Sequence, residues 1–236
     1  MCTVTYFLLK DKIVLTSNRD EKPNRSAQKI YTENNIFYPK DAIKNGTWFA
    51  VSKNGNAIVL LNGAFENHQK TGDYQKSRGL IVLDLIVKEN IFKSVHSIDL
   101  DNIEPFTLII LQEQNLAEFR WDGTQKHFEI LDASLPYIWS SATLYDAKAQ
   151  EKRKTIFQKF LENETISEES IWNFHHKKTD DLENGITMKR QNTIQTISTT
   201  QLLISDEMTL RHHNRLDKFS KPEKFFLNNE IHTPSL

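Results

Sequence analysis

The first seventeen residues consist of two apolar runs separated by a short charged break. Thr3–Leu9 and Lys12–Ser17 are rich in β-branched and aromatic residues, and Lys10 and Asp11 separate them. This pattern predicts a β-hairpin. Apolar residues stand at both odd and even positions of the first run, so we expect a strand that is buried on both faces. Such a strand is typical of a layered architecture.

The rest of the chain alternates between strand and helix patterns. Thr47–Ser52 and Asn56–Leu61 flank Asn54-Gly55, which predicts a second hairpin, whereas residues 22–46 read as irregular. We expect helices at Ser77–Lys88, about Asp146–Leu161 and Glu168–His176. Further strands are expected near Phe106–Leu111, Ala117–Trp121, His127–Leu131, Thr193–Ser198, Gln201–Ser205 and Thr209–His212. Strands at both ends with helices between them predict an α+β sandwich of two mainly antiparallel sheets covered by helices.

The composition is ordinary for a soluble globular protein. Of the 236 residues, 38% are hydrophobic and 26% are charged, and 30 Lys and Arg nearly balance 31 Asp and Glu. This balance gives no electrostatic case for nucleic acid as a partner. The length predicts one domain over residues 1–236.

The sequence also indicates a compartment. Cys2 is the only cysteine, which rules out an internal disulfide and fits a reducing environment. We find no signal-peptide pattern, and the longest apolar runs, Leu80–Val87 and Phe106–Leu111, are too short to cross a bilayer. We therefore expect a cytoplasmic protein without membrane insertion.

Cys2 has the clearest chemical meaning in the chain. If Met1 is removed, the thiol and a free α-amino group belong to the same residue. The amine, with a pKa of roughly 7.7–8.0, can then act as the general base for its own side chain, as in N-terminal-nucleophile catalysis.

The predicted hairpin places charged residues beside this cysteine. A tight turn at Lys10-Asp11 puts Cys2 across from Arg19, and longer turns put it across from Asp20 or Glu21. At most two of these three consecutive residues can share the face of Cys2. An arginine next to the thiol would lower the pKa of that thiol.

Five short motifs occur in the order and rough spacing of one family. They are Met1-Cys2, Asn18-Arg19-Asp20-Glu21, Gly46-Thr47-Trp48, Leu61-Asn62 and Ser77-Arg78-Gly79. Together they resemble the NRDE family of transport and Golgi organisation protein 2-like proteins. The resemblance implies an αββα fold similar to that of the N-terminal-nucleophile hydrolases.

The resemblance also implies roles for individual residues. Cys2 would be the nucleophile, Arg19 would hold the thiolate or a substrate carboxylate, and Asp20 would hold the α-amino group. Asn62 would donate to the oxyanion, and the substrate would contact Asn18, Glu21 and Trp48. Ser140-Ser141 departs from a Ser-Asn pair that is common in the family; if that Asn were a second oxyanion donor, its loss would weaken the amidase interpretation. An enzyme fold without activity is therefore one alternative.

Other signals have simpler interpretations. Glu21 could brace Arg25 or a backbone amide, and Glu151-Lys152-Arg153-Lys154 reads as a solvated helix face. His175-His176 and His212-His213 read as exposed or capping residues, because adjacent side chains point apart and neither pair chelates a metal alone. We expect no metal site.

Two functions follow from this pattern. The first is hydrolysis of the amide (C–N) bond of a small, partly apolar substrate, without a cofactor. The alternative is a non-enzymatic carrier or chaperone for haem, or for a lipid or acyl-coenzyme A, that uses the same cleft. The partner is a small molecule in both cases, and a homo-oligomer is one of the states left open.

Overall fold

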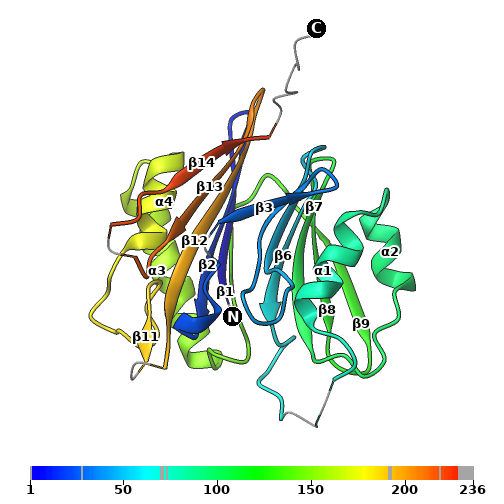
Figure 1. Cartoon of the computed structure of the whole chain (residues 1–236). Helices are drawn as coiled ribbons and strands as arrows, with labels where there is room; N and C mark the ends of the chain where they lie inside the picture. Colours follow the sequence, from blue (N-terminus) through cyan, green and yellow to red (C-terminus); the bar gives the residue numbers. More distant parts are fainter. Residues whose placement is uncertain are drawn as a thin grey trace, which may run out of the picture.

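The fold is an αββα sandwich, seen in a computed structural model that describes residues 2–27, 29–69, 72, 74–190, 193–217 and 219–227. Over these residues, two antiparallel sheets face each other and helices cover both outer surfaces (Figure 1). The predicted α+β architecture is confirmed.

The first sheet contains the N-terminal hairpin and the C-terminal strands. Its order is β10-β1-β2-β12-β13-β14, with β11 beside β12. The bounds are β1 Cys2–Leu9, β2 Lys12–Glu21, β10 Tyr137–Ser140, β11 Lys189–Arg190, β12 Ile194–Ile204, β13 Met208–Asn214 and β14 Glu223–Phe226. β12 is one long strand where two were predicted. The polar stretch in its middle continues the strand because it bonds to neighbours; for example, Thr199 donates to the Asn18 amide oxygen at 2.8 Å.

The second sheet has the order β3-β4-β5-β6-β7-β8-β9. Its bounds are β3 Ile30–Glu33, β4 Ile36–Pro39, β5 Phe49–Ser52, β6 Ala57–Asn62, β7 Phe106–Gln112, β8 Asn115–Trp121 and β9 Lys126–Leu131. The hairpin β3–β4 corrects the prediction that residues 22–46 are irregular. Its turn is Asn34-Asn35, and both residues have positive φ (50° and 61°), which asparagine tolerates.

Helices form the two outer layers. α1 (Arg78–Ile86) and α2 (Ile91–Ser97) cover the second sheet, and α3 (Ala147–Asn163) and α4 (Glu168–His176) cover the first. A short 3₁₀ helix spans Pro23–Arg25. The predicted helices are confirmed, whereas α2 and β10 were not predicted. Among the described helices, none combines the length and apolar character that a bilayer crossing requires.

β1 contacts a different layer with each of its faces. Cys2, Val4 and Tyr6 belong to the core between the sheets, where they are fully buried. Phe7 packs with the aromatic residues of α3 and α4 instead. This two-sided burial agrees with the apolar pattern of the first run and places Cys2 deep inside the molecule.

Candidate functional site

The N-terminal hairpin places Cys2 directly across from Arg19. The turn at Lys10-Asp11 is tight, with Lys10 at φ 52°, and the strands pair from Leu9 with Lys12 to Cys2 with Arg19. The strand register expected for a tight turn at Lys10-Asp11 is therefore confirmed. The registers that place Asp20 or Glu21 across from Cys2 are wrong.

The alternation of side chains along β2 separates the NRDE motif into two groups. Arg19 and Glu21 lie on the face of Cys2, as their contacts with Arg25 show. Asn18 and Asp20 lie on the opposite face, toward the helices. The expectation that at most two acidic or basic residues share the cysteine's face is confirmed.

Arg19 is held by three groups at once. It donates from Nη1 to the Arg25 carbonyl oxygen at 2.8 Å and from Nη2 to the Asp41 carboxylate. Its guanidinium carbon lies 3.8 Å from the centre of the Trp48 ring. Such stacking, together with an ion pair, fixes the guanidinium plane. The charge of Arg19 is thus matched by Asp41 rather than left free for Cys2.

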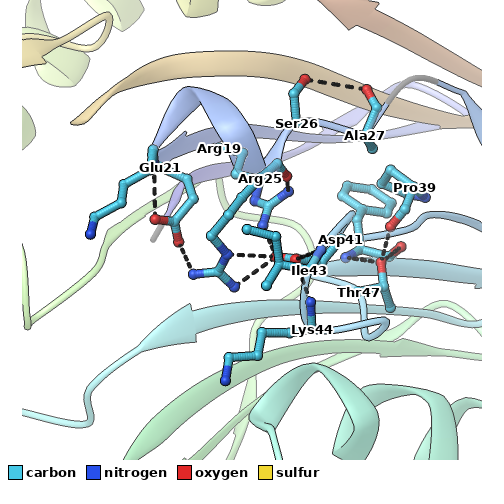
Figure 2. A network of polar contacts seen from close by, with 12 residues as sticks. Arg19, Glu21, Arg25, Ser26, Ala27, Pro39, Asp41, Ile43, Lys44 and Thr47 are labelled. Atoms are coloured by element: carbon cyan, nitrogen blue, oxygen red, sulfur yellow. Dashed lines mark hydrogen bonds and ion pairs between the residues drawn. The ribbon is translucent and has the colours of Figure 1, made fainter. Parts of the chain in front are cut away.

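Asp41 is the centre of a polar network that connects β2 to the segment between β4 and β5 (Figure 2). Its Oδ2 accepts from Arg19 and from Arg25, at 3.0 Å from Nε and 2.6 Å from Nη2. Its Oδ1 accepts from the backbone amides of Ile43 at 2.9 Å and Lys44 at 2.8 Å. Burial alone would raise the pKa of Asp41, but the Lys44 amide and the guanidinium of Arg19 outweigh it and lower that pKa. Sequence reasoning missed Asp41, since no local pattern indicates it.

Glu21 braces the same network. It accepts from Arg25 Nη1 at 2.6 Å and from the Lys22 backbone amide at 2.9 Å, as Figure 2 shows. The bracing interpretation of Glu21 is confirmed. A contact of Glu21 with substrate stays a prediction.

Asn18 and Asp20 are occupied on the helix side. The Asn18 amide donates to the carbonyl oxygens of His175 at 2.8 Å and Ile186 at 3.0 Å. Asp20 accepts from Tyr145 Oη at 2.9 Å and Thr196 Oγ1 at 2.6 Å. Complete burial raises the pKa of Asp20. The roles of Asn18 in substrate binding and of Asp20 in holding the amine stay predictions.

Cys2 is a buried thiol in this structure, with no exposed surface. Burial raises its pKa above the ordinary thiol value, and this effect exceeds the opposing effect of Arg19. The expected lowering effect of Arg19 on the pKa of this thiol is therefore present, but desolvation by burial outweighs it, and the net pKa is raised.

Ser141 connects Cys2 to Asn62. Its backbone amide donates to the Cys2 carbonyl oxygen at 3.1 Å, and its hydroxyl donates to the Asn62 carbonyl oxygen at 2.8 Å. Ser141, the second residue of the Ser140-Ser141 pair, thus joins β1 through its backbone amide to β6 through its hydroxyl.

A small cavity of about 70 Å³ lies beside this pair of strands. Four of the five motifs contribute to its wall, which consists of Arg19, Glu21, Arg25, Asp41, Lys44, Gly46, Thr47, Trp48, Leu60, Asn62, Ser77, Arg78 and Gly79. The fifth motif contributes Cys2, the strand partner of Arg19. The structure therefore gathers five sequence-distant motifs around one site.

Close backbone contact explains two glycines of these motifs. The Thr47 amide donates to the Gly79 carbonyl oxygen at 3.1 Å. A Cβ on Gly46 would lie 2.6 Å from the Gly79 carbonyl carbon, and a Cβ on Gly79 would lie 2.8 Å from the Thr47 nitrogen. Only glycine permits this approach of α1 to the segment before β5.

The sequence over residues 1–223 matches the family model described as Transport and Golgi organisation 2. The chain belongs to this family. The match extends well past the motifs, which end at Gly79. None of the curated proteins matches the sequence.

Solved structures place the family member among proteins with the N-terminal-nucleophile-hydrolase fold. A variant of the conjugated bile acid hydrolase from Clostridium perfringens has a TM-score of 0.61 at 9% identity, covering 97% of this chain and 93% of that chain. A Caenorhabditis elegans N-acylethanolamine-hydrolyzing acid amidase orthologue has a TM-score of 0.58 at 13% identity, covering 85% and 92%. A second bile acid hydrolase variant, with a cysteine replaced by alanine, has a TM-score of 0.53 at 9% identity, covering 97% and 94%. At these identities the likeness establishes the fold.

Two interpretations of polar residues outside the motifs are wrong. His175 and His212 are buried rather than exposed or capping, and Arg153 is fully buried rather than on a solvated helix face. One histidine of each pair contacts the other pair: His176 Nε2 lies 3.2 Å from His213 Nδ1. In the described residues, no group of three or more His, Cys, Asp or Glu is placed to hold a metal ion.

Proposed function

We propose that this family member is a cysteine hydrolase of the N-terminal-nucleophile type, acting on the amide bond of a small, partly apolar substrate. One observation carries the proposal: Cys2 pairs with Arg19 at the point where the other four motifs surround one cavity. The matching folds of an N-acylethanolamine-hydrolyzing amidase and a conjugated bile acid hydrolase support amide chemistry. The substrate in the name of the amidase is an N-acylethanolamine, and the substrate in the name of the hydrolase is a conjugated bile acid.

The proposed reaction begins with a protonated thiol. Cys2 Sγ attacks the amide carbonyl carbon while the thiol proton passes to the α-amino group of the same residue. Asn62 donates to the developing oxyanion. The C–N bond then breaks, the leaving amine takes the proton, and water hydrolyses the thioester to release the acid and restore the thiol.

Two features of the structure fit this order of events. The raised pKa of Cys2 keeps the resting thiol protonated at neutral pH, so a base adjacent to Sγ is required. The α-amine can supply that base only if Met1 is removed, and Met1 lies outside the described residues. Because Cys2 is fully buried, the substrate must displace part of the wall around it.

The decisive experiment measures turnover and covalent chemistry on the same protein. Purified full-length chain is incubated with N-acyl amides of increasing acyl length, and amine release is compared with that of Cys2→Ala. Intact mass spectrometry reports the state of Met1 and any acyl adduct. Amine release that depends on Cys2, with loss of Met1, supports the proposal. Equal release by both proteins, or a retained Met1, contradicts it.

A carrier function in the same cleft is the second proposal. Two observations support it. The Cys2 thiol has no exposed surface for a substrate to reach, and the Arg19 guanidinium is already paired with the Asp41 carboxylate. The ligand would be haem, or a lipid or acyl-coenzyme A, bound without turnover. Haem titration tests the first form: a Soret shift that saturates at one equivalent supports it, and an unchanged Soret band contradicts it.

A further inference from the structure

Arg153 is a fully buried cation on the inner face of α3. Its Nε donates to Ser140 Oγ at 2.9 Å, its Nη1 to the carbonyl oxygens of Asn184 at 3.1 Å and Gly185 at 2.6 Å, and its Nη2 to Thr3 Oγ1. All of these acceptors are neutral. No described carboxylate is in contact with the guanidinium, and a buried charge without a counter-charge is costly.

The Asp20 carboxylate interacts with the charge of Arg153 through space, but Tyr145 contacts both groups and no hydrogen bond joins them. The Arg153 guanidinium carbon lies 3.9 Å from the centre of the Tyr145 ring, and the Tyr145 hydroxyl is the group that bonds to Asp20. Asp20 thus compensates Arg153 only through space. Four of the five guanidinium N–H groups are donated to neutral acceptors, so one N–H of Nη2 is left for a further anion.

Arg153 lines a cavity of about 110 Å³ between α3, β10 and the ends of β6 and β7. The charged side chains of its wall are all cationic: Arg120, Arg153 and Lys154. Arg120 is neutralised by Glu118 at 2.7 Å. The nearest carboxylate oxygen to Lys154 belongs to the exposed Glu151, at 3.9 Å. Arg153 and Lys154 therefore provide an excess of positive charge to the cavity.

A larger pocket of about 720 Å³ adjoins this cavity, and the two share Gln150 and Lys154. Its wall combines apolar and aromatic side chains, among them Phe65, Leu144 and Tyr145, with charged side chains of both signs, namely Glu66, Asp146, Glu151, Lys154 and Arg190. A volume of this size is typical of a small-molecule site, whereas the smaller cavity accommodates only a head group.

We propose that the cavity at Arg153 and Lys154 binds the oxyanion of a small ligand, a carboxylate or a phosphate, whose body occupies the adjoining pocket. The oxyanion supplies the counter-charge that Arg153 lacks, and an arginine beside a lysine matches the geometry of such groups. The site is separate from the cavity at Arg19 and does not depend on any chemistry of Cys2.

The test uses inorganic phosphate and acetate as separate probes on the full chain, at constant ionic strength maintained with chloride. Binding is followed by thermal unfolding and by tryptophan fluorescence, because Trp139 lines the cavity. The variants are Lys154→Gln and Arg153→Gln. Lys159→Gln is the matched control, since Lys159 is an exposed lysine of the same helix that lines neither cavity.

We expect saturable binding of at least one probe to the wild type and to Lys159→Gln. Loss of one charged hydrogen bond in Lys154→Gln should weaken that binding by about tenfold. The probe that binds more tightly identifies carboxylate or phosphate as the preferred oxyanion. If Arg153→Gln does not fold, Lys154→Gln still decides the question. Equal binding by Lys154→Gln and Lys159→Gln, or no saturation by either probe, would overturn the proposal.

Discussion

Asp41 shows how one carboxylate organises the candidate site at the scale of single residues. It joins Arg19, Arg25 and the backbone of residues 43 and 44 in one network, and both Arg19 and Asp41 are almost completely buried. Removing one partner of such a pair leaves the other charge buried and uncompensated. The orientation of Arg19 beside Cys2 therefore depends on a residue outside all five motifs.

Replacing Asp41 with asparagine should lower the free energy of unfolding by about 3–5 kcal/mol, measured by urea titration. Glu169→Gln is the control, because Glu169 pairs with Arg211 at an exposed position and its loss should cost less than about 1 kcal/mol. The pKa of Asp41 is lowered in the folded state, so its contribution is present above about pH 3.9 and is lost as the pH falls through the folded pKa. Similar losses in the two variants would contradict the role of the network.

His212 predicts a second pH effect. The histidine is buried, and its Nδ1 lies 2.9 Å from Thr200 Oγ1. Burial lowers its pKa to about 4. The unfolded chain, with a histidine pKa of about 6.5, binds a proton that the folded chain does not, so stability falls as the pH drops below about 6.5.

The expected size of this effect is about 2 kcal/mol between pH 7 and pH 5. His212→Gln, which cannot titrate, should lose correspondingly less stability over that interval in urea titrations. His96→Gln removes an exposed histidine and serves as the control. A pH dependence of His212→Gln that equals that of the wild type would show that His212 does not contribute.

At the scale of elements, the site depends on how closely α1 approaches β5. The approach is made by Gly46 and Gly79, whose backbones meet at a distance that no Cβ permits. The N-terminus of α1 has no side-chain cap, since the Ser77 side chain accepts no capping hydrogen bond. The position of α1 is therefore set by glycine contact rather than by its cap.

Gly46→Ala should lower the free energy of unfolding by about 1–3 kcal/mol, because the added carbon forces α1 away from the sheet. Ser77→Ala should change it by less than about 0.5 kcal/mol. Chemical denaturation measures both values. A larger loss in Ser77→Ala than in Gly46→Ala would show that the helix cap, and not the glycine contact, holds α1.

At the scale of the whole molecule, β2 is an element enclosed on both edges and on both faces. It pairs with β1 on one side and β12 on the other, and it lies between the inter-sheet core and the helices α3 and α4. By contrast, β3, β9 and β14 have a neighbour on one side only in the described sheets. The NRDE motif therefore lies on a strand that is enclosed on all sides.

Amide hydrogen exchange measured by mass spectrometry should follow this order. We expect β1, β2 and β12 to exchange slowest, at rates set by global unfolding, and β3 and β14 to exchange fastest among the strands. Exchange in β2 that is as fast as in β14 would mean that the N-terminal hairpin separates from the sheet on its own. Such a result would also provide a route by which Cys2 becomes accessible.

The parts of the fold that depend on residues close together in the chain could be predicted from the sequence. The turn at Lys10-Asp11 and the period of the strands place Cys2 across from Arg19, because hairpin register depends on a few adjacent residues. Asn54-Gly55 predicts the β5–β6 hairpin for the same reason. The β3–β4 hairpin was missed because Asn34-Asn35 is a weaker turn signal than Asn-Gly.

The sequence by itself therefore determined the layered α+β fold, the hairpin register and the family, since each depends on local pattern or on the order of motifs. Only the tertiary structure decided that Asp41 neutralises Arg19, that Cys2 is a buried thiol with a raised pKa, and that Arg153 lies inside the molecule. Arg153 bonds to Thr3 across 150 positions of the chain. Burial and pairing between such distant residues set the charge states of the site, and no local pattern carries that information.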